Sequence, residues 1–333
     1  MKNSTITFRR LDGFADPFID QEGWNELAIQ NTSYSIFITY QWQKIWWENF
    51  GRGQLLLIAA IYNEKIIAIA PLFADSGMIF FTGSGGSDYL DFLGNVEAPD
   101  VLEGILNFAK EQVTDFIGFR FYHISENSVS NKLLFDFAGK NNWNIYDDHE
   151  LSAPMLEITK FPELASAAIR KKSLQRHDAW FRKNGKLVVE HFHRSEEIRP
   201  YLNEFFNQHI HRWSATPFPS LFLNPQQQLF YKQLSEKLSE TGWLRFTRIA
   251  WNGQSIAFHF GFNFRNNFLW YKPSFNIQLA KKSPGEVLLL HLISKALEEE
   301  AAIFDFGIGD EAFKSRFATH QRKVKTVELY IKE

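Results

Sequence analysis

The chain contains no cysteine. Disulfide bonds, thiolate nucleophiles and cysteine-bound zinc are therefore excluded. Its apolar runs all fall short of the roughly 20 residues that a membrane helix needs, and residues 1–10 lack the apolar segment of a secretory signal. These absences lead us to expect a cytoplasmic protein with no transmembrane segment.

An excess of charge of one sign is also missing. The 36 lysine and arginine residues nearly balance 38 aspartate and glutamate residues, for a net charge of −2, which argues against a general DNA-binding protein. No Walker loop, metalloprotease helix or Ser-His-Asp arrangement is present. His191 and His193 alternate on one face of a predicted strand, but no third ligand accompanies them, so we expect a surface strand and no metal site.

Aromatic residues, in contrast, are abundant. They make up 16% of the chain and include 34 phenylalanines, so we expect cores built from flat, bulky side chains. The length of 333 residues exceeds the roughly 250–300 residues at which one core usually stops growing. Two domains are therefore expected.

Two similar hairpins indicate an internal duplication. The first comprises residues 55–62 and 65–73 around Asn63-Glu64, and the second comprises residues 244–251 and 254–263 around Asn252-Gly253. An Asn-Gly pair between alternating apolar runs is a strong hairpin signal. An aromatic-rich helix precedes each hairpin, and alternating strands and helices follow it. We predict two copies of one mixed α/β domain, at residues 1–159 and 160–333, with Pro162 in the linker.

The second copy contains a well-marked helix start. In Ser283-Pro284-Gly285-Glu286, serine is suited to cap the helix, proline to its first position and glutamate to a capping box. The free amides of a helix start favour an anion, and Lys281 and Lys282 precede it. The segment is therefore either a phosphate site or a well-capped structural helix.

A further motif lies at residues 304–317, Phe-Asp-Phe-Gly-Ile-Gly-Asp-Glu-Ala-Phe-Lys-Ser-Arg-Phe. It resembles the C-terminal signature of the tandem-GNAT acetyltransferases associated with cellulose and exopolysaccharide synthesis (the CelD-like family), which are related to the Fem-type aminoacyl ligases of cell-wall synthesis. Shorter matching pieces lie at residues 46–51, 87–94, 209–213 and 283–285. The resemblance implies two tandem GNAT-like domains with mixed, mostly antiparallel sheets, the second of which holds acetyl-CoA as acyl donor.

The activity that the resemblance implies is direct N- or O-acetyl transfer to a saccharide or sugar-linked acceptor, with a general base and no covalent intermediate. Two alternatives stay open: a Fem-type ligase that takes its aminoacyl group from charged tRNA, and a non-catalytic GNAT-like binding protein. Neither the acyl group nor the oligomeric state follows from the sequence.

The chain departs from the family pattern at three positions. Gly285 stands alone where the pyrophosphate loop usually has two glycines, and Glu286 competes with a phosphate for the amides of the first turn. Phe313 replaces the tyrosine with which many GNAT enzymes protonate the leaving thiolate. In the first copy, the helix start at residues 95–100 is acidic and lacks the Pro-Gly pair, so we expect that domain to lack a cofactor.

Candidate catalytic residues follow the predicted strand at residues 302–306. Asp305, Asp310 and Glu311 lie where α/β sheets place their ligands, and Asp305 is the leading candidate for a general base. Asp310 is more simply explained as the cap of the next helix. Lys314 is expected to hold an anionic part of the acceptor. The predicted catalytic set is thus Asp305, Glu311 and Lys314.

The other candidates bind ligands. The cofactor set is Lys281, Lys282, Ser283, Pro284 and Gly285. The substrate set is Asp88, Tyr89 and Asp91 of a glycine-rich loop, with Trp213 and Arg316; a flexible connection, core packing and a solvent-facing helix are the respective alternatives. We expect the acceptor to bind between the two domains. The basic stretch at residues 170–186 is expected to be a solvated face rather than a contact for phosphate on tRNA, a nucleotide-sugar or a lipid.

Overall fold

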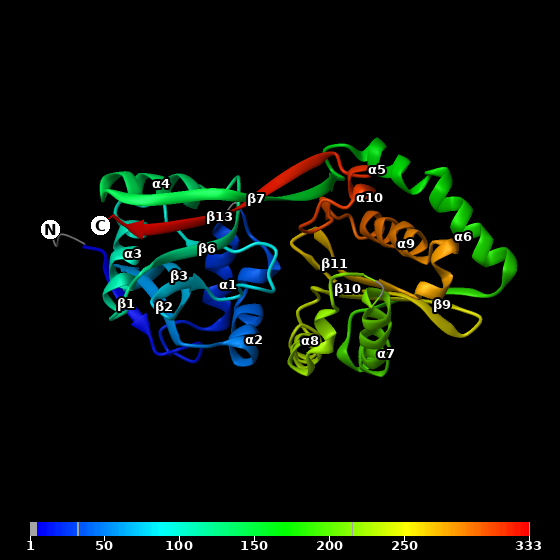
Figure 1. Ribbon diagram of the computed structural model, residues 1–333, viewed down its shortest axis with the longest axis horizontal. Helices are drawn as coiled ribbons and strands as arrows, with labels where there is room; N and C mark the ends of the chain where they lie inside the picture. Colours follow the sequence, from blue (N-terminus) through cyan, green and yellow to red (C-terminus); the bar gives the residue numbers. More distant parts are fainter. Residues whose placement is uncertain (1–4, 32, 215, 333) are drawn as a thin grey trace. The chain divides into compact units, whose positions relative to one another are not determined.

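The computed structural model describes residues 5–31, 33–214 and 216–332 (Figure 1). The chain forms two compact units: unit 1 comprises Met1–Ser152 and Arg322–Glu333, and unit 2 comprises Ala153–Gln321. Each unit consists of sheet strands with helices packed on them. No helix within the described ranges is both long and apolar enough to span a membrane.

Unit 1 is built from the first half of the elements. Its strands are β1 (Thr7–Leu11), β2 (Gln54–Tyr62), β3 (Lys65–Asp75), β4 (Met78–Phe81), β5 (Leu93–Gly94), β6 (Gly118–Ser125), and most of β7 (Trp143–Glu157) and β13 (His320–Ile331). Its helices are α1 (Gln21–Gln30), η1 (Ile36–Ile38), α2 (Tyr40–Phe50), α3 (Val101–Glu111) and α4 (Val129–Lys140). The strand order is β1-β2-β3-β4-β6-β13-β7, in which β4 and β6 run parallel.

Aromatic side chains fill both faces of this sheet. Successive side chains of a strand point to opposite faces, so Phe80 and Phe81 of β4 lie on different sides. Phe80 stacks on Phe73, which contacts Trp46 of α2. Phe81 contacts Phe121 on the other face, where the aromatic cluster continues to α4.

Unit 2 contains the second half of the elements. Its strands are the end of β7, β8 (Leu187–Phe192), β9 (Leu244–Trp251), β10 (Gln254–Phe264), β11 (Asn267–Phe275) and β12 (Ile303–Asp305), in the order β7-β12-β11-β10-β9-β8. Its helices are α5 (Pro162–Ile169), α6 (Lys172–Asn184), α7 (Ser195–Trp213), η2 (Leu221–Leu223), α8 (Pro225–Lys237), η3 (Ile277–Lys282), α9 (Pro284–Glu298) and α10 (Ala312–Ser315).

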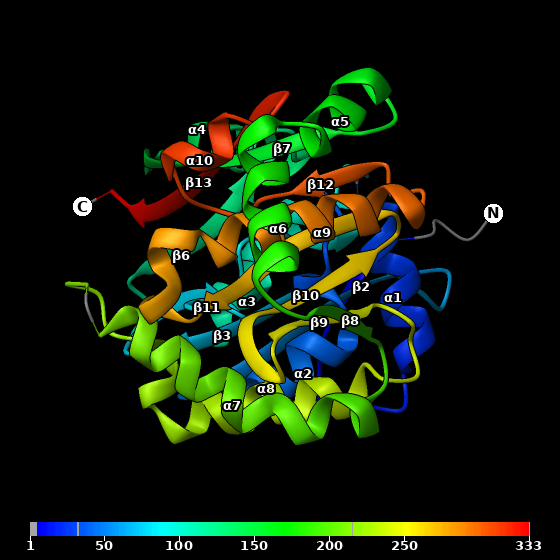
Figure 2. The same ribbon diagram turned by 90° about the vertical axis from the view of Figure 1, so that its right-hand side faces the viewer.

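The sheet of unit 2 separates two helical layers (Figure 1). On one face, Phe205 of α7 contacts Phe258 and Phe260 of β10. On the other face, the apolar side of α9 packs against Phe268 and Phe304, and α6 packs on α9. Figure 2 shows α6 and α9 beside each other from a second direction.

The two units are copies of one domain, as the hairpins predict. In each, a strand and two helices precede a three-strand meander (β2-β3-β4 and β9-β10-β11), which a helix and a parallel strand then follow. Even an irregularity is repeated: the register shifts at Ile67 in β3 and at Ile256 in β10, which are equivalent positions. Each parallel pair also contains three registered residue pairs.

The division of the chain differs from the prediction of 1–159 and 160–333. Arg322–Glu333, at the end of the second copy, belongs to unit 1 because β13 pairs with β6 from Val324 to Tyr330. The end of β7 belongs to unit 2, where Leu156 is registered with Phe304. The last strand of each copy thus pairs, at least in part, with a strand of the other unit. Pro162 is the first residue of α5 rather than a linker residue.

The exchanged strand yields a stability prediction. Val327 of β13 is fully buried and registered with Phe121 of β6. We expect Val327→Asp to destabilise unit 1 by about 4 kcal/mol or more, because it loses apolar burial and introduces a buried charge without a partner. Ile331→Asp is the matched control, since Ile331 of the same strand is 43% exposed. Urea unfolding and amide exchange of β6 would measure the difference; equal effects of the two variants would contradict the role given to β13.

Candidate active site

The candidate site of unit 2 lies where β11 parts from β12. The two strands run parallel and are registered from Asn267 with Ile303 to Leu269 with Asp305. β12 ends there, while β11 continues to Phe275 along β10. Open α/β sheets bind ligands beyond the carboxyl ends of parallel strands, where such strands diverge.

A β-bulge in β11 coincides with this divergence. Its register with β10 passes from Phe262–Leu269 to Phe260–Lys272, so Trp270 and Tyr271 stand opposite the single residue Gly261. A bulge bends its strand and changes the direction of the residues that follow. The bulge therefore turns the end of β11 away from the line of β12.

The equivalent position in unit 1 is filled by the chain itself. There β4 ends at Phe81, and the glycine-rich loop folds back so that the Leu90 amide donates to the His123 carbonyl of β6. The His123 ring makes a second contact with the Ser87 carbonyl at 2.7 Å. The segment that the sequence suggested as a substrate loop thus occupies the end of the parallel pair.

The substrate residues predicted on this loop are mostly buried. Tyr89 is 4% exposed with Arg322 over its ring. Asp91 is 1% exposed, and burial raises its pKa although serine hydroxyls, among them those of Ser130 and Ser33, donate to the carboxylate. Tyr89 and Asp91 are therefore structural, which corrects their assignment as substrate ligands, whereas Asp88 is partly exposed.

The start of α9 is confirmed at Pro284, but its cap differs from the prediction. Ser283 adopts a left-handed conformation (φ 56°) and its side chain makes no capping bond. Its carbonyl accepts the amides of Glu286 and Val287 instead. The predicted capping box is therefore wrong, because the preceding turn η3 fixes Ser283 in a conformation unsuited to side-chain capping.

Glu286 is held away from the helix amides by basic side chains. Its carboxylate pairs with Arg316 at 3.1 Å and lies 3.5 Å from His177 of α6. Arg316 also donates to Ser173 of α6. The sequence argument that Glu286 competes with phosphate is weakened by these contacts, since they engage its charge elsewhere.

The loop after β12 is organised around a buried ammonium group. Lys314 is 3% exposed; its Nζ donates to the Ile308 carbonyl at 2.9 Å and pairs with Glu311 at 2.7 Å. Gly309 (φ 133°) passes so close that an added Cβ would lie 2.3 Å from Glu311 and 2.8 Å from Lys314. The glycine is thus required for both its conformation and its lack of a side chain.

The acidic residues of this loop have different environments. Asp305 is fully buried and accepts the Gly307 amide at 2.8 Å, which does not fit a base that meets substrate. The helix N-cap is Glu311, without a side-chain cap, so the prediction that Asp310 caps it is wrong. Glu311 is 57% exposed and fixed by Lys314. It is the carboxylate of the predicted catalytic set that a ligand can reach.

A partly buried arginine lies beside the free end of β11. Arg212 of α7 donates to the Pro273 carbonyl at 2.8 Å, and its guanidinium lies over the rings of Phe275 (4.5 Å) and Trp213 (5.6 Å). Burial lowers its pKa, opposed by the negative charge of Glu311. Among the described residues no carboxylate lies within ion-pair distance of it. Since a guanidinium has five N–H donors, Arg212 retains the capacity to bind an anion.

Phe275 connects this arginine with the start of α9. A Cβ at Gly285 would lie 3.2 Å from the Phe275 ring, so Gly285 is in close contact with it. Phe313, in the place of the family tyrosine, packs against Trp270 and Phe306. The lining of the site therefore combines aromatic rings with cations.

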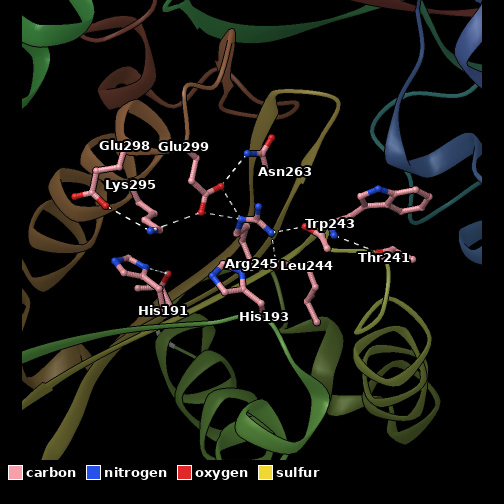
Figure 3. Close-up of polar contacts among 12 residues, drawn as sticks. His191, His193, Thr241, Trp243, Leu244, Arg245, Asn263, Lys295, Glu298 and Glu299 are labelled. Carbon is pink, nitrogen blue, oxygen red and sulfur yellow. Dashed lines mark hydrogen bonds and ion pairs between the residues drawn. The ribbon is translucent and has the colours of Figure 1, made fainter.

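The remaining histidine and basic candidates lie outside this site. His191 contacts the Thr247 hydroxyl at 2.9 Å and His193 contacts the Leu244 carbonyl at 3.2 Å. Nearby, Arg245 pairs with Glu299, which also accepts a bond from Asn263 (Figure 3). In the described part of the chain no group of three or more histidine and carboxylate side chains is arranged around a metal position.

Comparisons with known proteins agree with this geometry. Residues 168–315 match the family model of an acetyltransferase (GNAT) domain. FemX has a similar solved structure (TM-score 0.68, 9% identity, 94% of this chain and 96% of that one). So does a tandem GNAT protein from the clavulanic acid biosynthesis pathway (TM-score 0.54, 11% identity, 97% and 98%). The fold is that of the GNAT acyltransferases. A search of curated proteins finds no match.

A third similar structure is a conserved protein of unknown function from Bacteroides thetaiotaomicron (TM-score 0.60, 12% identity, 98% of this chain and 100% of that one). At such identities the likeness establishes the tandem GNAT fold alone. The CelD-like assignment and its link to exopolysaccharide stay predictions.

The sequence pointed to part of this candidate site. It identified the α9 start, the loop after β12 and Trp213. The sequence did not single out Arg212, because nothing in the sequence of a helix shows that an arginine is buried. The matching piece at residues 209–213 nevertheless contains this residue. The bulge in β11 was missed as well; Gly261 within an aromatic strand was the available sign for it.

Buried histidines make the stability of unit 2 depend on pH. Burial lowers the pKa of both His209 and His259 to about 3, so each stays neutral in the folded protein while the unfolded chain takes up protons below about pH 6.5. Stability is therefore complete above pH 6.5 and falls as the pH drops toward 3.

We expect the unfolding free energy to decrease by about 2 kcal/mol per buried histidine between pH 7 and pH 5. Urea unfolding at fixed ionic strength would measure this. In His209→Gln, the decrease in unfolding free energy between pH 7 and pH 5 should be smaller by about 2 kcal/mol. The same decrease as in the wild type would contradict the lowered pKa of His209.

Proposed function

We propose that the protein is an acyl-CoA-dependent acyltransferase whose active site lies in unit 2, at the divergence of β11 and β12. The observation that carries the proposal is this divergence, with the β11 bulge at its origin and the α9 start at its far end. Unit 1, whose equivalent gap is closed by its own loop, is proposed to bind no acyl donor.

The residues around α9 fit the phosphate end of acetyl-CoA. Gly285 presents its amide without a side chain, and Lys281 and Lys282 lie in the adjacent η3. Arg316 adds a positive charge, and both Arg316 and His177 contact the Glu286 carboxylate. A helix start with nearby cations is suited to pyrophosphate, although Pro284 contributes no N–H.

For the chemical step, we assign general-base catalysis to Glu311. It would accept the proton of an acceptor amine or hydroxyl as the nitrogen or oxygen attacks the thioester carbonyl, and the C–S bond would then break to release the CoA thiolate. Lys314 positions Glu311 through their 2.7 Å contact. Asp305 supports the turn below. Phe313 has no proton to give, so the thiolate is protonated from solvent.

We propose a saccharide or sugar-linked acceptor that carries an anionic group. Arg212 supports this class, because a partly buried guanidinium without a carboxylate partner favours a carboxylate or phosphate. Trp213 offers an aromatic surface beside it. A role of Asp88 in binding the acceptor is part of the proposal.

A second candidate is aminoacyl transfer from charged tRNA. One observation favours it: Lys172, Arg176 and Lys183 are exposed along α6, near the cationic η3. Titration with acetyl-CoA, free CoA, UDP-sugars and charged tRNA separates the candidates. Absence of acetyl-CoA binding at about 1 mM, the upper range of ordinary substrate affinities, would contradict the first proposal.

The base assignment leads to a direct test. We expect Glu311→Gln to lower kcat by about 10²- to 10⁴-fold with little change in acetyl-CoA affinity, because shape is kept while the proton acceptor is lost. Glu298→Gln is the control, since Glu298 is 67% exposed and lies at the other end of α9. Turnover by Glu311→Gln equal to that of the control would remove Glu311 as the base.

The role of Arg212 is tested through the acceptor. Arg212→Met keeps much of the contact with Phe275 but removes the charge, and we expect KM for an anionic acceptor to rise about 10- to 100-fold. The acetyl-CoA KM should change little. For a neutral analogue of the acceptor, KM in this variant should equal KM in the wild type. An equal rise in KM for anionic and neutral acceptors would show that Arg212 does not recognise the charge of the acceptor.

A further inference from the structure

The bulge in β11 is accompanied by a buried imidazole. The Tyr271 amide donates to Nε2 of His259 at 3.3 Å. His259 belongs to β10 and is fully buried. Its ring stacks beside Phe268 and Trp270 of β11, with centroids 6.2 and 5.7 Å away. His259, on the neighbouring strand β10, thus supplies a hydrogen-bond acceptor for a backbone amide inside the bulge.

Gly261 makes room for this ring. A Cβ at Gly261 would lie 2.2 Å from Cε1 and 2.4 Å from Nε2 of His259, and 2.3 Å from the Leu269 carbonyl. Any other residue at Gly261 would therefore collide with both the imidazole and the backbone of β11. His259 and Gly261 are a matched pair, in which one residue fills the space that the other leaves.

The first copy provides an internal comparison. The hairpins at Asn63 and Asn252 align His259 with Ala70 and Gly261 with Leu72. In unit 1, Leu72 is registered with Phe81 without a shift, and the Thr82 amide donates to the Pro71 carbonyl in the next step of the ladder. The copy without the imidazole and the glycine therefore has no bulge at this position.

We propose that His259 is a positioning residue of the acyl-donor site, which holds the β11 bulge and thereby the separation of β11 from β12. The inference rests on the proposed function for its link to the acyl donor. The geometric part, that His259 fixes the bulge, stands on the contacts alone.

The proposal requires a particular tautomer. If Nε2 accepts the Tyr271 amide, the proton is on Nδ1, which has no partner among the described residues. The other tautomer would direct an Nε2 proton toward the nearby Leu269 carbonyl, and Tyr271 would lose this acceptor while the Nδ1 lone pair stayed unpaired. Because the bulge is held through acceptance of the Tyr271 amide by Nε2, the proposal requires the first arrangement. Burial keeps the ring neutral, because it lowers the pKa to about 3.

Long-range ¹⁵N–¹H spectra of histidine-labelled protein at pH 7 test this part without any ligand. We expect a neutral His259 with its proton on Nδ1, assigned by its loss in His259→Gln, and slow exchange of the Tyr271 amide. A proton on Nε2, or a charged ring, would overturn the proposal.

The link to the acyl donor is tested with two substitutions at the same position. Gln places its Oε1 as many bonds from Cβ as Nε2 of histidine, so His259→Gln should keep acetyl-CoA affinity within about threefold. His259→Phe keeps a ring but offers no acceptor, and it should weaken binding about 10- to 100-fold and raise KM for the donor, since small displacements of a binding edge are costly. The Tyr271 amide should exchange faster in the Phe variant alone.

His191→Phe is the matched control, because His191 lies two strands away on β8 and contacts Thr247 rather than β11. It should leave acetyl-CoA affinity unchanged. Equal binding by the wild type, His259→Phe and His191→Phe would overturn the positioning role. If the wild type itself binds no acetyl-CoA, the proposed function fails, whereas the tautomer and the Tyr271 exchange still decide whether His259 holds the bulge.

Discussion

The separation of two parallel strands after three registered pairs is the constraint on which the site depends. Backbone groups at that point need partners other than the neighbouring strand. In unit 2 the Asp305 carboxylate accepts the Gly307 amide, and the Phe306 amide donates to the Pro154 carbonyl of the adjacent segment. A fully buried carboxylate at this position is thus part of the backbone bonding of the turn. This burial separates Asp305 from ligands, whereas Glu311 further along the loop is 57% exposed.

The two copies satisfy the same constraint in different ways. Unit 1 folds its glycine-rich loop onto β6, whereas unit 2 extends β11 past a bulge and leaves the end of β12 to α10 and its loop. The aligned residues at this position differ between the copies: Ala70 corresponds to His259 and Leu72 to Gly261.

The sequence predicted features that depend on local chemistry. Turn residues at Asn252-Gly253 and a proline at the first position of α9 act over a few residues, and both were located correctly. The strand exchange was not predictable in this way, because the pairing of β13 with β6 joins Val327 to Phe121 across two hundred residues of sequence. The prediction of a side-chain cap at Ser283 was wrong for a related reason. The preceding turn η3 sets the left-handed conformation of Ser283, and the sequence of η3 has no distinct pattern. Arg212 and His259 are distinguished by their burial, which a single sequence does not display.

The net charge of the chain does not describe how charges are arranged around the end of β11 and β12. The net charge is −2, yet Arg212, Arg316 and Lys314 lie around the end of β11 and β12 with Glu311 and Glu286 engaged in ion pairs. Each ion pair leaves its carboxylate less able to repel an approaching anion, and aromatic rings under the guanidinium exclude water from it. Interactions between charges strengthen where water is excluded. The proposed anionic ligand would meet a few placed side chains, and overall composition is a poor guide to the charges around it.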